Sequence, residues 1–313
     1  MRRFVGLLTI VLLAGPGCGD RATLSIPLTV ELPTSSDMAS LWAAGVSDVY
    51  LSAGPLGAQW HFDGADWGRL DIDSIEQPHL YFAGTGPDDI WLSDWFHYDG
   101  ASWTAKEPST IRQMWAIGCG PDGKLSGVGV AASTDGMALY QANGDTWTPI
   151  MNLPKGMMYP WIDPGTGQLF DQMLGDIDQT TKVRRFDGKR WVVFDIGRFY
   201  SSVSPFGVGD GVVYAVATVN TTVDVLRFDG THWSPIHSGT SKLYGAGGTR
   251  STGPLLGGEG AVYRVSASGL TPVITDDTMI FRQVQVVDGY LVLHGEYKKQ
   301  ALGSALLIRE LPN

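Results

Sequence analysis

The chain has 313 residues, with 32 acidic against 22 basic side chains and a formal net charge of −10. A surface with this charge repels the phosphate backbone of nucleic acids, so we do not expect nucleic-acid binding. Two cysteines are too few for a disulfide framework, and the length is sufficient for a large hydrophobic core in a single domain.

The first residues have the pattern of a secretory signal peptide. Arg2 and Arg3 precede an apolar stretch, residues 4–14, and small residues lead from there to Cys18. The apolar stretch is too short for a comfortable membrane span. We therefore expect residues 1–17 to be removed. Residues 18–313 should form a single domain, because no charge run or polar linker divides them.

Cys18 follows small residues directly and resembles the lipidated cysteine of bacterial lipoproteins. The resemblance implies a lipid anchor at Cys18, and Gly19 in place of an aspartate implies sorting to the outer membrane. The protein would then be tethered to the cell envelope, facing the periplasm or the outside, without spanning the membrane. Ordinary secretion, with Cys18 removed or left free, is the alternative. The other cysteine, Cys119, is expected to be a small buried thiol.

A tight turn followed by a tryptophan recurs along the chain. Four copies read Phe/Tyr-Asp-Gly-x-x-Trp and one reads Asn-Gly-x-x-Trp, with the tryptophans 36, 44, 44 and 42 residues apart. This period is that of a four-stranded propeller blade. Glycine tolerates positive φ and aspartate bonds its own backbone, so the motif is typical of a structural turn. The turn residues are Asp63, Gly64, Trp67, Asp99, Gly100, Trp103, Gly144, Trp147, Asp187, Gly188, Trp191, Asp229, Gly230 and Trp233.

A second signal, a polar turn that opens into a β-rich apolar run, occurs seven times and predicts β-hairpins. The tryptophan turn also has a sixth, degenerate copy, in which Leu270 takes the place of the tryptophan. We therefore predict an all-β, seven-bladed β-propeller with four-stranded antiparallel blades. The blades are expected at residues 38–75, 78–109, 112–153, 156–197, 200–239, 241–275 and 278–311.

The last predicted blade lacks an outer strand, because the chain ends after the β-rich run that closes at Leu311. A β-rich segment near the N-terminus, at about residues 23–32, has no blade of its own. We predict that this segment completes the last blade and closes the ring, because an unclosed ring would leave exposed sheet edges.

These repeats resemble the tandem-repeat β-propellers of secreted bacterial lipoproteins. They are more loosely similar to kelch-like, sialidase-like and photosystem II stability-factor-like propellers. The sialidase Asp-box has a residue between its Asp and Gly, which are adjacent at Asp63-Gly64. The Gly-Gly pairs that mark every kelch blade occur in one blade only, at Gly247-Gly248 and Gly257-Gly258. The resemblance therefore implies the fold and transfers no activity.

Candidate catalytic residues are sparse. His61 and His97 stand at the same repeat position, where other blades have Gln or Arg, so we interpret them as polar strand residues. No zinc-ligand, nucleophile-elbow or phosphate-loop motif occurs, and we assign no catalytic residue, no bound metal and no cofactor. The acidic loop at residues 71–76 lacks the glycine and the further spaced oxygens of an EF-hand, and a structural calcium ion in a propeller loop is an open alternative. The plentiful carboxylates leave a second alternative, a glycosidase.

One repeated aromatic position lies on the predicted innermost strands. It could form a collar at the mouth of the channel that stacks on a sugar or peptide ring. Alternatively, these rings are ordinary core between blades. Ser204 and Gln285 interrupt the series and mark irregular places where a ligand site could form. The candidate ligand-contact aromatics are Trp42, Tyr81, Trp115, Tyr159 and Tyr244.

Together these patterns predict a monomeric, non-catalytic envelope lipoprotein. Its closed ring of rigid blades would act as a binding or assembly scaffold for a glycan or protein partner, with contact to the membrane only through the lipid anchor. The alternative is a carboxylate-based glycosidase or lyase on the same scaffold. The sequence does not identify the ligand.

Overall fold

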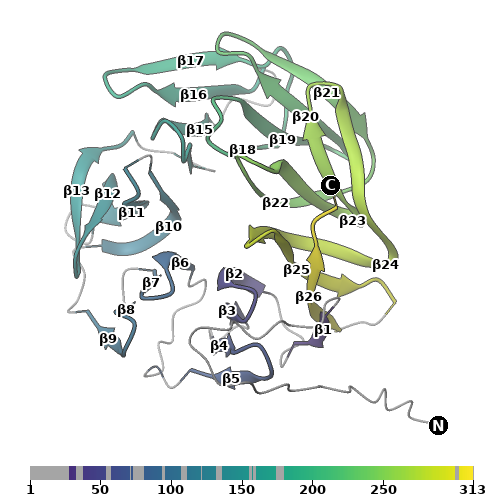
Figure 1. Ribbon diagram of the computed structural model, residues 1–313. Coiled ribbons are helices and arrows are strands. Elements are labelled where there is room, and N and C mark those ends of the chain that lie inside the picture. The colour runs from purple at the N-terminus through teal and green to yellow at the C-terminus, as the bar shows by residue number, and fades with distance from the viewer. Residues whose placement is uncertain are drawn as a thin grey trace.

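The computed structural model arranges β-strands in a ring around a central axis (Figure 1). It describes residues 28–32, 38–53, 58–70, 72, 81–93, 96–106, 111–120, 122–131, 136–154, 157, 160–173, 180–299 and 303–312. Every regular element in these ranges is a β-strand, which confirms the predicted all-β propeller. Cys18, Tyr159 and the expected signal peptide lie outside the described residues, as does the side chain of Trp115.

The described strands form six sheets, of which five are four-stranded antiparallel blades. In each blade the strands follow one another in chain order, from the axis to the rim (Figure 1). We call them blades 1 to 5. Blade 1 is β2 (Met38–Gly45), β3 (Asp48–Ala53), β4 (Ala58–Phe62) and β5 (Trp67–Arg69); blade 2 is β6 (Phe82–Gly86), β7 (Asp89–Leu92), β8 (Phe96–Tyr98) and β9 (Trp103–Ala105); blade 3 is β10 (Ile111–Cys119), β11 (Leu125–Ala131), β12 (Met137–Asn143) and β13 (Thr146–Asn152); blade 4 is β14 (Trp161–Ile162), β15 (Leu169–Met173), β16 (Lys182–Phe186) and β17 (Trp191–Asp195); blade 5 is β18 (Ser202–Gly207), β19 (Val213–Val219), β20 (Thr222–Phe228) and β21 (Trp233–Gly239).

The sixth sheet, which we call the last sheet, replaces the final two predicted blades. β24 runs unbroken through the predicted boundary between them, and Glu259 pairs with Ile280 across it. The prediction of seven blades is therefore not confirmed, since the described strands form six sheets. Within the last sheet, residues 261–266 pair with 269–275 and residues 279–287 pair with 290–297, as the two predicted blades require, and Glu259–Ile280 is the one described pair that joins them. The strands of the last sheet, in order, are β1 (Leu28–Glu31), β26 (Ser304–Glu310), β25 (Tyr290–Tyr297), β24 (Gly269–Val287), β23 (Gly253–Ser266) and β22 (Leu243–Thr249).

Glycines allow β22 and β24 of the last sheet to approach each other closely. A Cβ atom on Gly247 would lie 2.0 Å from the carbonyl oxygen of Val284, and one on Gly245 would lie 2.4 Å from that of Arg282. The backbone of β24 therefore lies directly against β22, closer than any residue with a side chain would permit. An equally close contact joins two separate blades, since a Cβ atom on Gly165, between β14 and β15, would lie 2.0 Å from the carbonyl oxygen of Gly209, between β18 and β19. The contact therefore shows that the final two repeats pack tightly and does not by itself make them one sheet.

The hydrophobic core lies between neighbouring sheets. Tyr50 of blade 1 packs with Phe82 and Ile90 of blade 2, and Phe170 of blade 4 packs with Val203 of blade 5. Side chains alternate between the two faces of a strand, so each central strand contributes to two such layers. The core is thus a series of layers between blades, which makes each blade depend on both neighbours.

Two sets of contacts join the last sheet to the beginning of the described chain. β1 pairs antiparallel with β26, and Arg309 secures it by donating to Leu28 O at 2.6 Å and to Thr29 Oγ1 at 2.8 Å. On the inner side, Gln285 Oε1 accepts from Ala43 N at 2.8 Å, while Gln285 Nε2 donates to Ala43 O at 3.2 Å. The last sheet thus holds both the N-terminal strand and blade 1.

Candidate functional site

The Asp-Gly-x-x-Trp turns lie at the same end of their blades as the turns between the first two strands. In blade 1, Val49 pairs with Ala43 of β2 and with Phe62 of β4, so the β2–β3 and β4–β5 turns are neighbours. A Cβ atom on Gly64 would lie 2.7 Å from Ser47 Cβ. The register repeats in blades 2 to 5. We call this the turn end of the blades.

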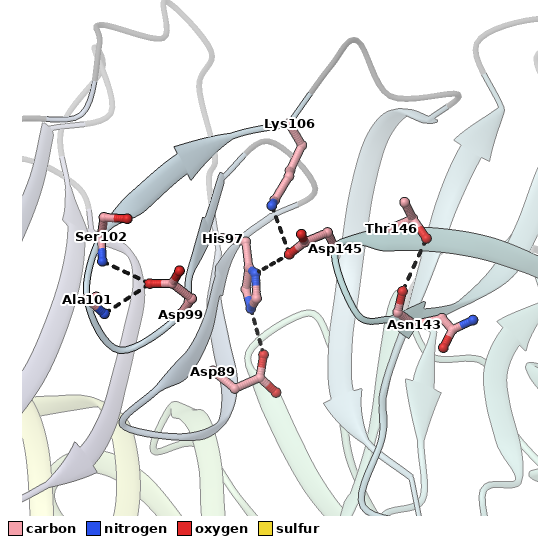
Figure 2. Close-up of polar contacts among 9 residues, drawn as sticks. All are labelled: Asp89, His97, Asp99, Ala101, Ser102, Lys106, Asn143, Asp145 and Thr146. Atoms are coloured by element: carbon pink, nitrogen blue, oxygen red, sulfur yellow. Dashed lines mark hydrogen bonds and ion pairs between the residues drawn. The ribbon is translucent and has the colours of Figure 1, made fainter.

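Each aspartate of these turns holds the turn with its own carboxylate. Asp99 Oδ1 accepts hydrogen bonds from Ala101 N at 3.0 Å and from Ser102 N at 2.9 Å (Figure 2). The next residue, Gly100, has a φ of +89°, which residues with a side chain rarely adopt. Both carboxylate bonds recur at the other Asp-Gly turns, at Asp63, Asp187 and Asp229.

The tryptophans of the motif pack where the outer strands begin. The Trp67 ring lies 5.4 Å from that of Phe62, and the Trp233 ring lies 4.9 Å from that of Phe228, the residue before each turn. Trp147 instead contacts Trp91 of blade 2 edge-on at 5.3 Å. These geometries give the motif a structural role. Four of the tryptophans are the first residues of β5, β9, β17 and β21, while Trp147 is the second residue of β13, after the Asn143-Gly144 turn.

The turn aspartates predict a dependence of stability on pH. The backbone N–H groups of His232 and Thr231 hold the pKa of Asp229 at about 2, against about 4 in an unfolded chain. Because the pKa of Asp229 is lower in the folded chain than in the unfolded chain, its carboxylate stabilises the folded state at any pH above the pKa of the unfolded chain. This stabilisation is lost as the pH falls to the pKa of the folded chain. We expect the difference in unfolding free energy between the wild type and Asp229→Asn to be constant above about pH 5 and to shrink between about pH 4 and pH 2.

Urea unfolding at a series of pH values measures this difference. Asp187 supplies a second test, since its carboxylate accepts the same two backbone hydrogen bonds and Asp187→Asn should remove a similar pH dependence. A difference between the wild type and Asp229→Asn that does not change down to about pH 2 would contradict the role of the carboxylate.

A charged cluster connects blades 2 and 3. His97 of β8 is buried, and its ring stacks on Trp91 at 4.5 Å. Its Nε2 lies 2.8 Å from Asp89 Oδ1 and its Nδ1 lies 3.0 Å from Asp145 Oδ1, which also contacts Lys106 Nζ at 2.9 Å (Figure 2). Lys106 first, and then His97, lower the pKa of Asp145. Because both ring nitrogens contact carboxylates, neither is left to act as a general base or to bind a metal.

The same repeat position has related contacts in the neighbouring blades. In blade 1, His61 Nε2 lies 2.7 Å from Asp48 Oδ1, and the His61 ring stacks on Tyr50 at 4.5 Å. In blade 3, Gln141 Nε2 donates to Asp122 Oδ2 at 3.1 Å. Each contact joins a side chain of the third strand to the aspartate beside the first hairpin turn. The position is therefore used to connect strands within a blade.

Three of the five candidate ligand-contact aromatics have described side chains. Trp42 lies against blade 2, since a Cβ atom on Gly84 would lie 2.6 Å from Trp42 Cζ2. The ring of Tyr244 is covered by Arg282, whose guanidinium carbon lies 4.1 Å from the ring centroid. Tyr81 is half-buried just before β6, and burial raises its pKa. Contact between these aromatics and a ligand stays a prediction.

Sequence reasoning missed Trp161, the counterpart of Trp42 in blade 4. Trp161 pairs with Phe170 as Trp42 pairs with Tyr50. Its ring lies against the next blade, where a Cβ atom on Gly207 would be 3.1 Å from Trp161 Cη2. The turn that follows Trp161 is longer than the matching turn in blade 1. The alignment of the repeats therefore placed Tyr159, and not Trp161, at the position of Trp42. An alignment of the second strands, which matches Phe170 with Tyr50, would have identified Trp161 through its pairing with Phe170.

Two buried carboxylates were also missed. Asp171 Oδ2 accepts from Arg184 Nε at 3.0 Å and lies 2.9 Å from Arg184 Nη2, with both residues buried. In blade 5, Asp224 Oδ2 accepts from the Tyr200 hydroxyl at 2.6 Å and lies 3.2 Å from Arg198 Nη1. Burial, and then Asp224, raise the pKa of Tyr200. Both residues are single aspartates within otherwise apolar strands, a pattern that indicates a buried carboxylate with a partner. The pattern does not recur at the same position in the other blades, so the comparison of repeats did not reveal it.

The described residues show no arrangement of a metal centre or an activated thiol. Within them, no three His, Cys, Asp or Glu side chains come together as a metal site. Almost all of the loop considered for calcium, residues 71–76, lies outside the described ranges. Cys119 is half-buried and its Sγ donates to Gly84 O at 3.6 Å. Burial, with smaller contributions from Asp89 and Asp122, raises the pKa of the thiol, which disfavours the reactive thiolate.

The architecture matches solved β-propellers over most of the chain. YCF48, solved bound to D1 peptide, has a TM-score of 0.60 at 13% identity, covering 91% of this chain and 97% of that one. The chain folds as a β-propeller. The WD40 propeller domain of Doa1 (TM-score 0.55, 11% identity, covering 92% and 97%) and U3-55K (0.56, 9%, covering 89% and 98%) are also similar. No family model and no curated protein matches the sequence. At these identities the likeness shows the fold alone.

Proposed function

We propose that this protein is a non-catalytic scaffold that binds an extended segment of a protein partner. One observation carries the proposal: several of the described side chains best suited to chemistry are engaged in holding the ring together. His97 connects blades 2 and 3, Arg184 neutralises Asp171 inside blade 4, and Arg198 reaches Asp224 of blade 5. Such networks stabilise a rigid framework. The rigid ring then presents its turns and outer strands for binding.

We favour a protein partner over a glycan. A sugar stacks on an open aromatic face, whereas Tyr244 is covered by Arg282 and Trp42 lies against Gly84 of the next blade. The similar propeller YCF48 was solved with a peptide bound, which supports a peptide ligand for this architecture. The alternative of a glycosidase or lyase needs two carboxylates facing each other across a cleft. The turn aspartates are each bonded to their own turn, which speaks against that use.

The predicted location in the cell envelope belongs to the same proposal. Among the described residues, no helix has the length and hydrophobicity of a membrane span. A lipid at Cys18 would place the ring beside the membrane, and loss of membrane association in a Cys18→Ala variant, measured by cell fractionation, tests this part separately.

Parallel binding screens test the function. The domain comprising residues 18–313 would be screened against an array of linear peptides and an array of glycans, with fluorogenic glycosides as an activity control. We expect saturable peptide binding, no glycan binding and no hydrolysis. Specific glycan binding without peptide binding, or turnover of a glycoside, would overturn the proposal.

A further inference from the structure

The outer strands of blades 1 to 5 differ in how their exposed edges are protected. A free strand edge offers N–H and C=O groups to any extended chain, and natural sheets protect such edges by shortness or by proline. β5 and β9 have three residues each. β13 and β21 contain Pro149 and Pro235, each two residues after the tryptophan of its repeat. In β17, Val193 stands at this place, and the strand has five residues without a proline.

Among the described residues, none forms a backbone hydrogen bond to the outer side of β17. Ile196 N donates to Thr181 O at 3.0 Å, and hydrogen-bonded pairs alternate with non-bonded pairs from there along the two antiparallel strands. β17 is the terminal strand of its sheet. The side chain of Val193 is 49% exposed, and Ile150 of β13 is the other large apolar side chain that is exposed to this degree among the described residues. The N–H and C=O groups that point away from β16 are those of Trp191, Val193 and Asp195.

The charge around this edge is opposite to that of the whole chain. Residues 180–200 contain six basic and two acidic side chains, whereas the chain carries a net charge of −10. Arg190, immediately before β17, has an 81% exposed side chain, and that of Arg198, beyond its end, is 49% exposed. Arg184 and Arg198 are paired with Asp171 and Asp224, so the positive charge that favours the approach of an acidic segment comes mainly from the exposed Lys189 and Arg190 at the start of β17.

We propose that the outer edge of β17 binds an acidic, extended peptide segment of the partner, which adds to blade 4 as a fifth strand. The peptide backbone pairs with Trp191, Val193 and Asp195, as in other cases of strand addition to a sheet edge. One apolar side chain of the peptide covers Val193, and acidic side chains lie near Lys189 and Arg190. The inference rests on the proposed function and specifies where it takes place.

Binding of a labelled octapeptide of alternating glutamate and valine, measured by fluorescence polarisation, tests the edge. The charge control is the same peptide with lysine in place of glutamate. We expect the acidic peptide to bind, and Val193→Pro to weaken binding about tenfold or more because it removes an outward N–H group and blocks close approach. Val193→Thr, which keeps the N–H group, should bind within about threefold of the wild type.

A second measurement is independent of whether Val193→Pro folds. Methylating the backbone nitrogens of alternate peptide residues blocks one edge of the peptide, so one of the two methylated series should lose binding while the other keeps it. Amide exchange at Val193 should also slow in the complex. Equal binding of both methylated series, or of the lysine peptide, would overturn this placement. If the peptide array gives ligands that Val193→Pro still binds, the scaffold function stands and only the β17 edge is refuted.

Discussion

Replacing Arg184 with alanine is expected to lower the free energy of unfolding by about 3–5 kcal/mol. Asp171 is fully buried and receives two contacts from the guanidinium of Arg184, at 3.0 Å and 2.9 Å. Removing Arg184 leaves the Asp171 carboxylate in the core without this cation, and the desolvation cost is then no longer offset. The guanidinium carbon also lies 5.1 Å from the ring centroid of Trp191, so packing is lost as well. Equilibrium unfolding in urea measures the change.

A matched control lies in the same blade. Arg190 has an 81% exposed side chain and lies 3.9 Å from Asp187, so Arg190→Ala should change stability by less than about 0.5 kcal/mol. A double variant, Arg184→Met with Asp171→Leu, should lose less than Arg184→Ala because no uncompensated charge remains. Equal stability of Arg184→Ala and Arg190→Ala would contradict the buried ion pair as the cause.

The parts of the fold that the sequence predicted well depend on residues close together in the chain. The turn at Asp99 is completed by hydrogen bonds from Ala101 and Ser102, two and three residues later. Such a turn needs no knowledge of the rest of the molecule, and its recurrence at blade spacing was enough to predict a propeller. The histidines also followed from the repeat, since a position that accepts His, Gln or Arg cannot depend on imidazole chemistry.

The parts that the sequence did not predict depend on contacts between distant segments. Whether the final two repeats form two sheets or one is decided by Glu259 pairing with Ile280, a contact that no local pattern marks. Trp42 and Trp161 take equivalent places only when aligned through their partner strands. The β17 edge is an intermediate case, because the missing proline is visible in the repeat alignment. The absence of proline matters because β17 is the terminal strand of its sheet, which the structure shows and the sequence alone does not.

The close approach of β22 and β24 can be tested at Gly247. A Cβ atom there would lie 2.0 Å from the carbonyl oxygen of Val284, and a backbone group cannot move aside as a flexible side chain can. We expect Gly247→Ala to destabilise the protein by about 3 kcal/mol, the upper part of the range for overpacking a core. The damage should be concentrated where β22 and β24 meet, so amide exchange should accelerate in the last sheet before it does in blade 2.

Gly118 of β10 provides the control, because a Cβ atom added there meets nothing within 4 Å. Like Gly247→Ala, the variant Gly118→Ala replaces a glycine on the innermost strand of its sheet. We expect it to leave the urea midpoint of unfolding nearly unchanged. If Gly247→Ala proves as stable as Gly118→Ala, then β22 and β24 do not approach as closely as described. The single glycine thus tests how tightly the innermost strands of the final two repeats pack against each other.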